Sequence, residues 1–63
     1  MINKIKEKRE AIGLTQAELA EKIGVDTSTV CLWESGKREP KFTSVMKMAK
    51  VFECSPDQVV YID

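Results

Sequence analysis

Apolar residues recur along the chain at the three- and four-residue spacing of helices, interrupted at short intervals by glycine, proline and capping residues. This pattern predicts five short helices, over about residues 2–12, 16–23, 27–35, 42–52 and 56–61. Strand signals are weak throughout the sequence. We therefore expect one compact all-α domain over residues 1–63, because a chain of this length has room for a single small core.

The clearest helix boundaries surround the second and third predicted helices. Thr15 and Glu18 form a T-x-x-E capping box at the start of the second helix, and Gly24 ends it. The third helix follows after a short turn, with Asp26 or Thr27 as its N-cap. Two helices joined by a short turn that contains glycine are typical of a helix-turn-helix.

The last two predicted helices supply further apolar surface. The helix over residues 42–52 has an apolar stripe, which we assign to the core and which comprises Phe42, Val45, Ala49 and Phe52. Ser55 followed by Pro56 predicts the start of the final helix, because proline is favoured at the first helical position.

The third predicted helix has two different faces. Val30, Trp33 and Glu34 share one face, which we assign to the core or its border. The opposite face carries mostly small polar side chains and one leucine without a core to face: Thr27, Ser28, Cys31, Leu32 and Ser35. An exposed face of this kind is compatible with a surface that docks a partner.

The charges of the chain balance but are unevenly distributed. Ten Lys and Arg residues match ten Asp and Glu residues, so the formal net charge is zero and does not by itself favour a nucleic-acid partner. Residues 1–9 nevertheless carry a net charge of +3, residues 10–36 of −4, residues 37–50 of +4 and residues 53–63 of −3. A basic block therefore follows the third helix directly.

The residue types exclude several functional classes. The chain has no histidine and only two cysteines, Cys31 and Cys54, so His-based catalysis and a metal site are not expected. We predict a protein that is not an enzyme and that has no cofactor, no metal and no small-molecule ligand. No apolar run approaches the roughly 20 residues that span a bilayer, and the N-terminus lacks the apolar core of a signal peptide. We therefore expect a cytoplasmic location and no membrane partner.

The segment LTQAELAEKIGVDTSTVCLWESGKREP resembles the lambda-repressor/Cro-type helix-turn-helix family, also called the Xre family. The pattern T-Q-x-E-L-A-x-x-I-G covers the second helix, and W-E-x-G-K-R-x-P covers the end of the third helix and the loop after it. The resemblance implies a compact five-helix domain whose second and third helices form the helix-turn-helix. It also implies a sequence-specific DNA-binding transcriptional regulator, with a repressor preferred, that binds a two-fold operator as a homodimer.

The resemblance assigns roles to individual residues. With the third helix in the major groove, base edges would face Thr27, Ser28 and Leu32. Phosphates would be held by residues at the start of the second helix and after the third, namely Gln16, Ser35, Lys37, Arg38 and Lys41. All of these side chains also have a local interpretation as capping or solvated residues. The alternative function is a protein-interaction or antitoxin-type module with the same fold, which would not need these residues together.

Three further expectations concern structure. Arg9 falls on the apolar stripe of the first helix, and the family pairs this position with that of Glu34, so we predict a partly buried ion pair. Glu53 stands where the family's fourth helix usually ends in glycine, which predicts strain if the residue is left-handed. Two interpretations stay open for four residues near the C-terminus, a dimer contact or closure of the core: Val59, Val60, Tyr61 and Ile62.

Overall fold

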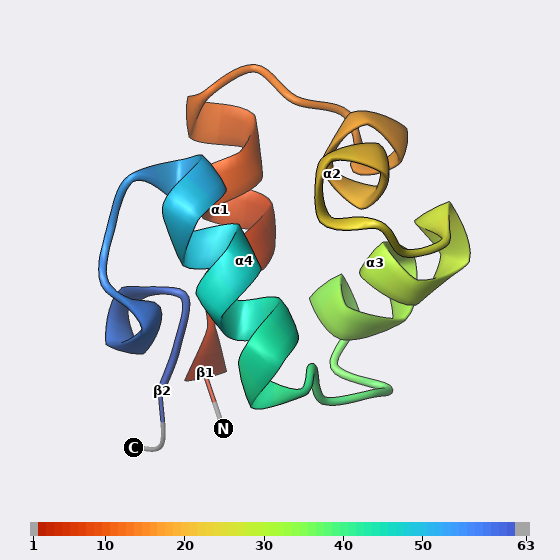
Figure 1. Cartoon of the computed structure of the whole chain (residues 1–63). Coiled ribbons are helices and arrows are strands. Elements are labelled where there is room, and N and C mark those ends of the chain that lie inside the picture. Colours follow the sequence, from red (N-terminus) through yellow and green to blue (C-terminus); the bar gives the residue numbers. More distant parts are fainter. Residues whose placement is uncertain (1, 62–63) are drawn as a thin grey trace.

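This computed structural model describes residues 2–61, with Ile2 and Tyr61 described by their backbone only. Within these residues the chain forms four α-helices, one short 3-10 helix and two short strands (Figure 1). In chain order the elements are β1 (Ile2–Asn3), α1 (Ile5–Ala11), α2 (Gln16–Ile23), α3 (Thr27–Glu34), α4 (Phe42–Phe52), η1 (Pro56–Gln58) and β2 (Val60–Tyr61). The predicted bounds of the second and fourth helices are confirmed, and the third ends one residue earlier than expected.

The prediction of five α-helices is wrong at both ends of the chain. Ile2–Asn3 does not continue α1 but pairs antiparallel with Val60–Tyr61. The predicted fifth helix is reduced to η1, after which the chain turns into β2. The backbone groups here bond across the two termini instead of along a helix, as in the 2.7 Å bond from Lys4 N–H to the Val59 carbonyl. The β-branched residues after Gln58 favour this extended pairing.

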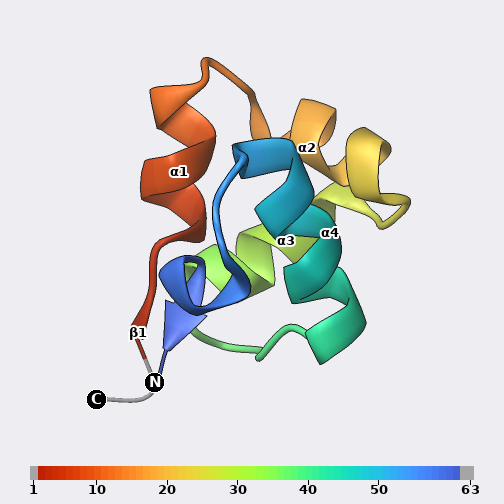
Figure 2. The same ribbon diagram turned by 60° about the vertical axis from the view of Figure 1, so that its left-hand side comes forward.

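The four α-helices pack around one hydrophobic core, which η1 and β2 close at one side (Figure 2). The core receives side chains from every α-helix and one from the turn before β2: Ile5, Leu19, Ala20, Ile23, Val30, Trp33, Val45, Met48, Ala49, Phe52 and Val59. None of the described helices has the length and apolar character needed to span a bilayer.

One predicted core position and one further apolar residue lie at the surface. Phe42 was expected on the core stripe, but 69% of it is exposed, because it is the first residue of α4 and extends past the edge of the core. Ile12, directly after α1, is 46% exposed. Met46, one turn after Phe42, is 45% exposed and lies on the same side of α4.

All four α-helices end in the same hydrogen-bonded turn. In α3, for example, the N–H of Lys37 donates to the Leu32 carbonyl (3.0 Å) and that of Gly36 to the Trp33 carbonyl (3.1 Å), which together form a Schellman motif. This turn requires a residue with positive φ, and the four that supply it are Gly13, Gly24, Gly36 and Glu53. Glu53, with φ of 56°, is thus the one residue with a side chain at such a position within residues 2–61.

The strain at Glu53 leads to a stability prediction. Replacing Glu53 with glycine is expected to raise the free energy of unfolding by about 1 kcal/mol, because a Cβ is unfavourable in the left-handed region. Thermal unfolding should show a rise in Tm of about 4–8 °C. Glu53→Ala is the matched control, since it removes the carboxylate and keeps the Cβ. An equal rise in both variants would assign the effect to charge and contradict the prediction.

Candidate nucleic-acid interface

The start of α2 is fixed by the predicted capping box. The N–H of Glu18 donates to the Thr15 hydroxyl (3.1 Å), and the N–H of Thr15 donates to the Glu18 carboxylate (2.8 Å). These two bonds hold the pKa of the Glu18 carboxyl below its usual value. Gln16 occupies the first position of α2, where its N–H has no carbonyl one turn earlier to bond. The capped helix therefore presents a fixed N-terminus that favours an anion.

The turn between α2 and α3 sets which face of α3 is exposed. The N–H of Val25 donates to the Ala20 carbonyl (3.0 Å), and Val25 packs against the core. Val30 and Trp33 are buried, as the helical spacing predicted. The predicted outward face is exposed at four positions and half-buried at Leu32, the four being Thr27, Ser28, Cys31 and Ser35. Small polar side chains therefore form most of the surface of α3.

Arg9 and Glu34 form the expected ion pair between α1 and α3. The Arg9 Nε donates to Glu34 Oε2 at 2.7 Å and its Nη2 donates to Oε1 at 3.1 Å, in a bidentate arrangement. The remaining Nη1 donates to the Leu14 carbonyl at 2.7 Å. Only 10% of the Arg9 side chain and 5% of the Glu34 side chain are exposed. This pair therefore fixes the end of α3 to α1 and to the loop before α2.

The charge of Glu34 is stabilised in spite of its burial. Burial raises the pKa of Glu34, but hydrogen bonds from Arg9 and Gln16 and the positive charge of Arg9 outweigh it, so the pKa lies below the usual carboxyl value. The hydrogen bond to Glu34 raises the pKa of Arg9 in turn. Both side chains are therefore ionised at neutral pH.

Two polar links to α3 were not predicted from the sequence. The Gln16 side-chain Nε2 donates to Glu34 Oε1 at 3.0 Å, across 18 positions of the chain. The Asn3 side-chain Nδ2 donates to the Trp33 carbonyl at 3.1 Å. Nothing local in the sequence marks these partners, since each bond joins elements that meet only after packing. The first link places Gln16 directly beside the end of α3.

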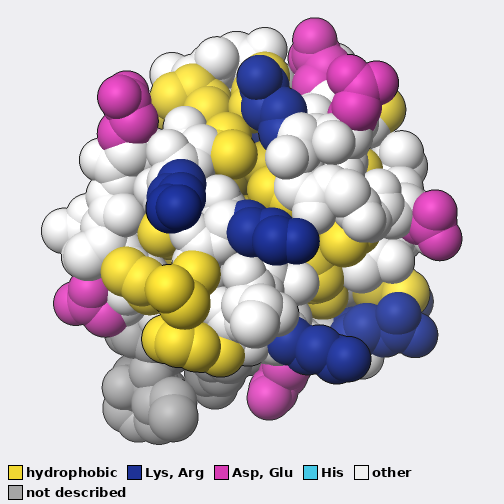
Figure 3. Space-filling view, in the orientation of Figure 1, with side chains coloured by type: hydrophobic (Ala, Val, Ile, Leu, Met, Phe, Trp, Pro, Cys, Tyr) yellow, Lys and Arg dark blue, Asp and Glu magenta, His cyan; other side chains and the backbone are white. Residues whose placement is uncertain are grey.

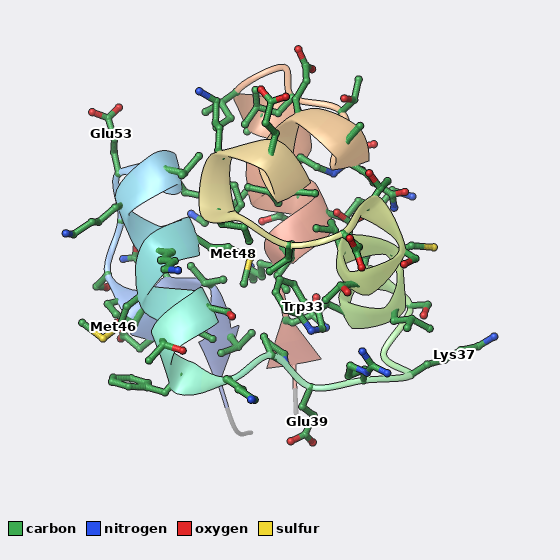
Figure 4. All side chains as sticks on the ribbon, turned by 45° about the vertical axis from the view of Figure 1, so that its right-hand side comes forward. Trp33, Lys37, Glu39, Met46, Met48 and Glu53 are labelled. Atoms are coloured by element: carbon green, nitrogen blue, oxygen red, sulfur yellow. The ribbon has the colours of Figure 1, made fainter. Side chains whose placement is uncertain are left out.

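The loop after α3 carries exposed basic side chains. The hydroxyl of Ser35 donates to the Leu32 carbonyl at 3.1 Å, so its proton is engaged within the turn. Lys37, Arg38 and Lys41 are all exposed, and Lys37 points away from the rest of the molecule (Figure 4). Lys and Arg side chains cover this loop at the lower right of Figure 3. Gln16, beside Glu34, is therefore close to the start of a basic loop.

A comparison with known proteins agrees with this arrangement. Residues 5–59, nearly the whole chain, match the family model described as helix-turn-helix. The chain belongs to this helix-turn-helix family. It is 36% identical over 63 residues to a protein of Archaeoglobus fulgidus named an uncharacterized HTH-type transcriptional regulator, covering all of this chain and 90% of that protein.

Two solved structures are similar to this helix-turn-helix protein. One is the c2 repressor of phage P22 in complex with a synthetic operator, with a TM-score of 0.81, 30% identity and coverage of 86% of this chain and 82% of that one. The other is the restriction-modification controller protein C.AhdI of Aeromonas hydrophila, with a TM-score of 0.81, 33% identity and coverage of 87% and 83%. The similarity therefore covers most of this chain and extends beyond the two helices of the helix-turn-helix.

The four C-terminal residues for which a dimer contact and closure of the core were both open have different environments in the structure. Val59 is fully buried in the core of this helix-turn-helix domain. Its side chain therefore closes the core, and the prediction that it makes a dimer contact is wrong. Val60 is half-buried and pairs with Asn3, and the backbone of Tyr61 pairs with that of Ile2. Ile62 lies outside the described residues. Among the residues with described side chains, the exposed large hydrophobic ones are Ile12, Phe42 and Met46.

Acidic residues and cysteines are spread over the domain. Within residues 2–61, no group of three or more Cys, Asp or Glu side chains lies close enough together to hold a metal ion. Cys31 is exposed on α3, and Cys54 is half-buried beside the core.

Proposed function

We propose that the protein is a sequence-specific DNA-binding transcriptional regulator, acting as a repressor, that places α3 in the major groove. The observation that carries this proposal is the Gln16–Glu34 hydrogen bond. It joins the N-terminus of α2 to the end of α3, three residues before Lys37, the first basic residue of the loop. Two groups suited to phosphate oxygens therefore flank the same end of an exposed polar helix.

Base contacts are assigned to the exposed face of α3. Thr27 and Ser28 are exposed in its first turn, and their hydroxyls are able to bond several bases. Leu32, half-buried one turn later, supplies an apolar surface for a thymine methyl group. The helix contains no Arg, Asn or Gln, the residues with the strongest bidentate base contacts. We therefore expect modest sequence discrimination, supported by the shape of the DNA.

Phosphate contacts are assigned to both sides of α3. Gln16 has its backbone N–H and the second hydrogen of its Nε2 available, because Glu34 accepts only one of them. Lys37, Arg38 and Lys41 supply exposed cationic groups. Ser35 contributes its hydroxyl oxygen or backbone, since its proton is donated to Leu32. These groups position the helix without reading sequence.

Homodimerisation on a two-fold operator completes the proposal. One eight-residue helix contacts few base pairs, and the described surface of α2 and α3 carries several carboxylates, so a single copy binds weakly. The similar c2 repressor is described as a protein in complex with an operator. Two copies related by a two-fold axis would place their α3 helices in major grooves about one helical turn apart.

The proposal is tested by salt-dependent titration on genomic DNA fragments, followed by sequencing of the bound sites. Binding should weaken linearly on a log–log plot against salt, because phosphate contacts release counterions. The enriched sites should be two-fold symmetric. Absent or salt-insensitive binding would refute DNA binding and favour the protein-interaction or antitoxin-type module.

A second prediction separates base contacts from phosphate contacts. Thr27→Ala and Ser28→Ala are expected to change which bases are preferred in the selected sites, with a cost of about 1–3 kcal/mol at the contacted base pair only. Binding to unrelated sequences should stay the same. Thr43→Ala, an exposed threonine on α4, is the control and should leave the preferred site unchanged. Unchanged preferences in both α3 variants would contradict the assigned base contacts.

A further inference from the structure

The most exposed large apolar side chains after the helix-turn-helix lie together on α4. Phe42 is 69% exposed and Met46 is 45% exposed, and residues four apart share one side of a helix. The same side continues into an open hollow lined by Met46, Ala49, Lys50, Glu53, Cys54 and Pro56. A hydrophobic patch is visible at the lower left of Figure 3. We call Phe42, Met46 and this hollow the α4 surface.

The α4 surface is separate from the proposed DNA contacts. Met46 and Lys37 lie at opposite sides of the molecule, with Trp33 and Met48 between them (Figure 4). Lys41 nevertheless serves as the N-cap of α4, so the surface begins where the basic loop ends. An occupant of the α4 surface would therefore adjoin bound DNA without covering the exposed face of α3.

We infer that the α4 surface binds a second copy of this chain, with the two α4 helices antiparallel. This inference deepens the proposed dimer, and it rests on the proposed function in that respect. A two-fold interface brings the same patch of both copies together, so the patch must complement itself. The α4 surface meets this condition, because a protruding aromatic ring stands at one end and a hollow at the other.

The register follows from helix geometry. When Met46 of each copy lies at the two-fold axis, residues four positions before it come opposite residues four positions after it. Phe42 of one copy then enters the hollow beside Ala49 and Lys50 of the other, where the ammonium group meets the aromatic ring. A buried phenyl ring removes about 150–250 Å² of surface from water. Each dimer contains this contact twice.

Charge supports the same register. Lys41 and Glu53 are exposed at opposite ends of α4, about 18 Å apart along the helix axis. In the antiparallel arrangement Lys41 of one copy lies within about two residues of Glu53 of the other, and both side chains are long enough to close that distance. A parallel arrangement would instead place like charges together. The termini of α4 therefore select the antiparallel pair.

The size of the surface predicts a weak dimer. The exposed side of α4 is about 18 Å long and about 10–12 Å wide, which is well below the roughly 800 Å² per partner of a standard stable interface. Copies therefore associate at high concentration in solution. They associate more strongly when adjacent half-sites hold them close together.

Cross-linking tests the register directly. In a Cys31→Ser/Cys54→Ala background, Met46→Cys places one thiol of each copy near the two-fold axis, and Ile12→Cys places a thiol of matched exposure on a different surface (45% and 46%). In a glutathione buffer, Met46→Cys should form the disulfide dimer with an equilibrium constant at least about tenfold larger than Ile12→Cys. Equal dimer formation by the two variants would overturn the inference.

Sedimentation equilibrium and half-site binding separate this inference from DNA binding itself. Phe42→Lys should raise the dimer dissociation constant at least about tenfold and abolish cooperative binding to a two-fold site, while Ile12→Lys changes neither. Phe42→Lys should keep wild-type affinity for a single half-site. Wild-type dimerisation by Phe42→Lys would overturn the α4 surface and leave DNA binding intact. DNA binding absent from every variant, with dimerisation lost only in Phe42→Lys, would refute the proposed function and retain the surface.

The oligomeric state and DNA binding of the wild-type chain also test self-association. A protein that stays monomeric at millimolar concentration and binds a two-fold site without cooperativity would overturn self-association, and would leave the α4 surface to a different protein.

An exchange of the charges at the two ends of α4 tests the antiparallel register. Because Lys41 is also a proposed phosphate contact, the dimer is measured here by sedimentation without DNA. Lys41→Glu and Glu53→Lys should each weaken it, and the double variant should restore it. Additive weakening in the double variant would contradict the antiparallel register.

Discussion

Replacing Glu34 with alanine is expected to lower the free energy of unfolding by about 3–5 kcal/mol. Only 5% of the Glu34 side chain is exposed, and its loss leaves the Arg9 guanidinium buried without its bidentate partner. The Gln16 amide loses its acceptor as well. Since small domains have only about 5–15 kcal/mol of stability, the variant should be largely unfolded at moderate denaturant concentrations. Urea unfolding followed by Trp33 fluorescence measures the change.

A double replacement controls for the buried charge. Arg9→Met with Glu34→Met removes both ions and keeps apolar volume, so it should be much more stable than Glu34→Ala alone. DNA affinity of Glu34→Ala is expected to fall mainly with its folded fraction, with a smaller additional loss because Gln16, a proposed phosphate contact, loses the acceptor that positions it. An unfolding midpoint equal to that of the wild type would show that the ion pair contributes little.

The same ion pair makes stability depend on acid pH. The pKa of Glu34 is lower in the folded protein than its value of 4.5 in the unfolded chain, so its contribution is complete above pH 4.5. Stability is then lost as the pH falls through the folded pKa. The corresponding change for Arg9 falls at a pH too alkaline to matter. Urea unfolding between pH 7 and pH 3 should show a steeper loss for the wild type than for the double Met variant.

Removing both basic side chains from the start of the loop is expected to weaken binding to all DNA sequences alike. Lys37→Ala with Arg38→Ala should lower affinity about tenfold or more at low salt, because two exposed cations next to the end of α3 no longer neutralise phosphates. The salt slope should decrease by about 2, roughly one for each lost contact. The preferred site should not change. Titrations on a selected site and on an unrelated duplex, at several salt concentrations, measure both effects.

A charge-matched variant controls for net charge. Lys6→Ala with Lys47→Ala removes the same two charges from α1 and α4, at exposed positions outside the proposed phosphate contacts. It should reduce affinity much less than the loop variant does. Equal losses in the two variants would mean that overall charge attracts the DNA and that Lys37 and Arg38 have no specific position on it.

Local sequence signals were sufficient to predict features that depend on interactions between neighbours in the sequence. The capping box of Thr15 and Glu18 and the glycine turns after α1, α2 and α3 depend on bonds within a few residues. The expectation for Glu53 came instead from the family resemblance, and the residue is left-handed, with φ of 56°. The helical period likewise placed Val30 and Trp33 in the core and the small polar residues of α3 outside it. The pairing of Arg9 with Glu34 was expected through the family resemblance, and its geometry agrees with that expectation.

The predictions from sequence were wrong where the environment of a segment depends on distant parts of the chain. Residues 2–3 have a helical apolar pattern, yet they pair with β2, because the last residues return beside the first. Phe42 has the correct period for the core stripe, but the buried part of α4 begins only at Val45, three residues later. Val59 has the same apolar character as its neighbours, and only the packing shows that it is buried.

The sequence by itself thus determined the helix-turn-helix, its caps and the exposed face of α3, because the short-range geometry of a helix decides these features. Only the tertiary structure decided that Gln16 meets Glu34 beside the basic loop, and that Phe42 and Met46 remain uncovered on α4. Both depend on how separate helices approach one another. That approach is set by the summed packing of the whole core, which no local pattern of residues records.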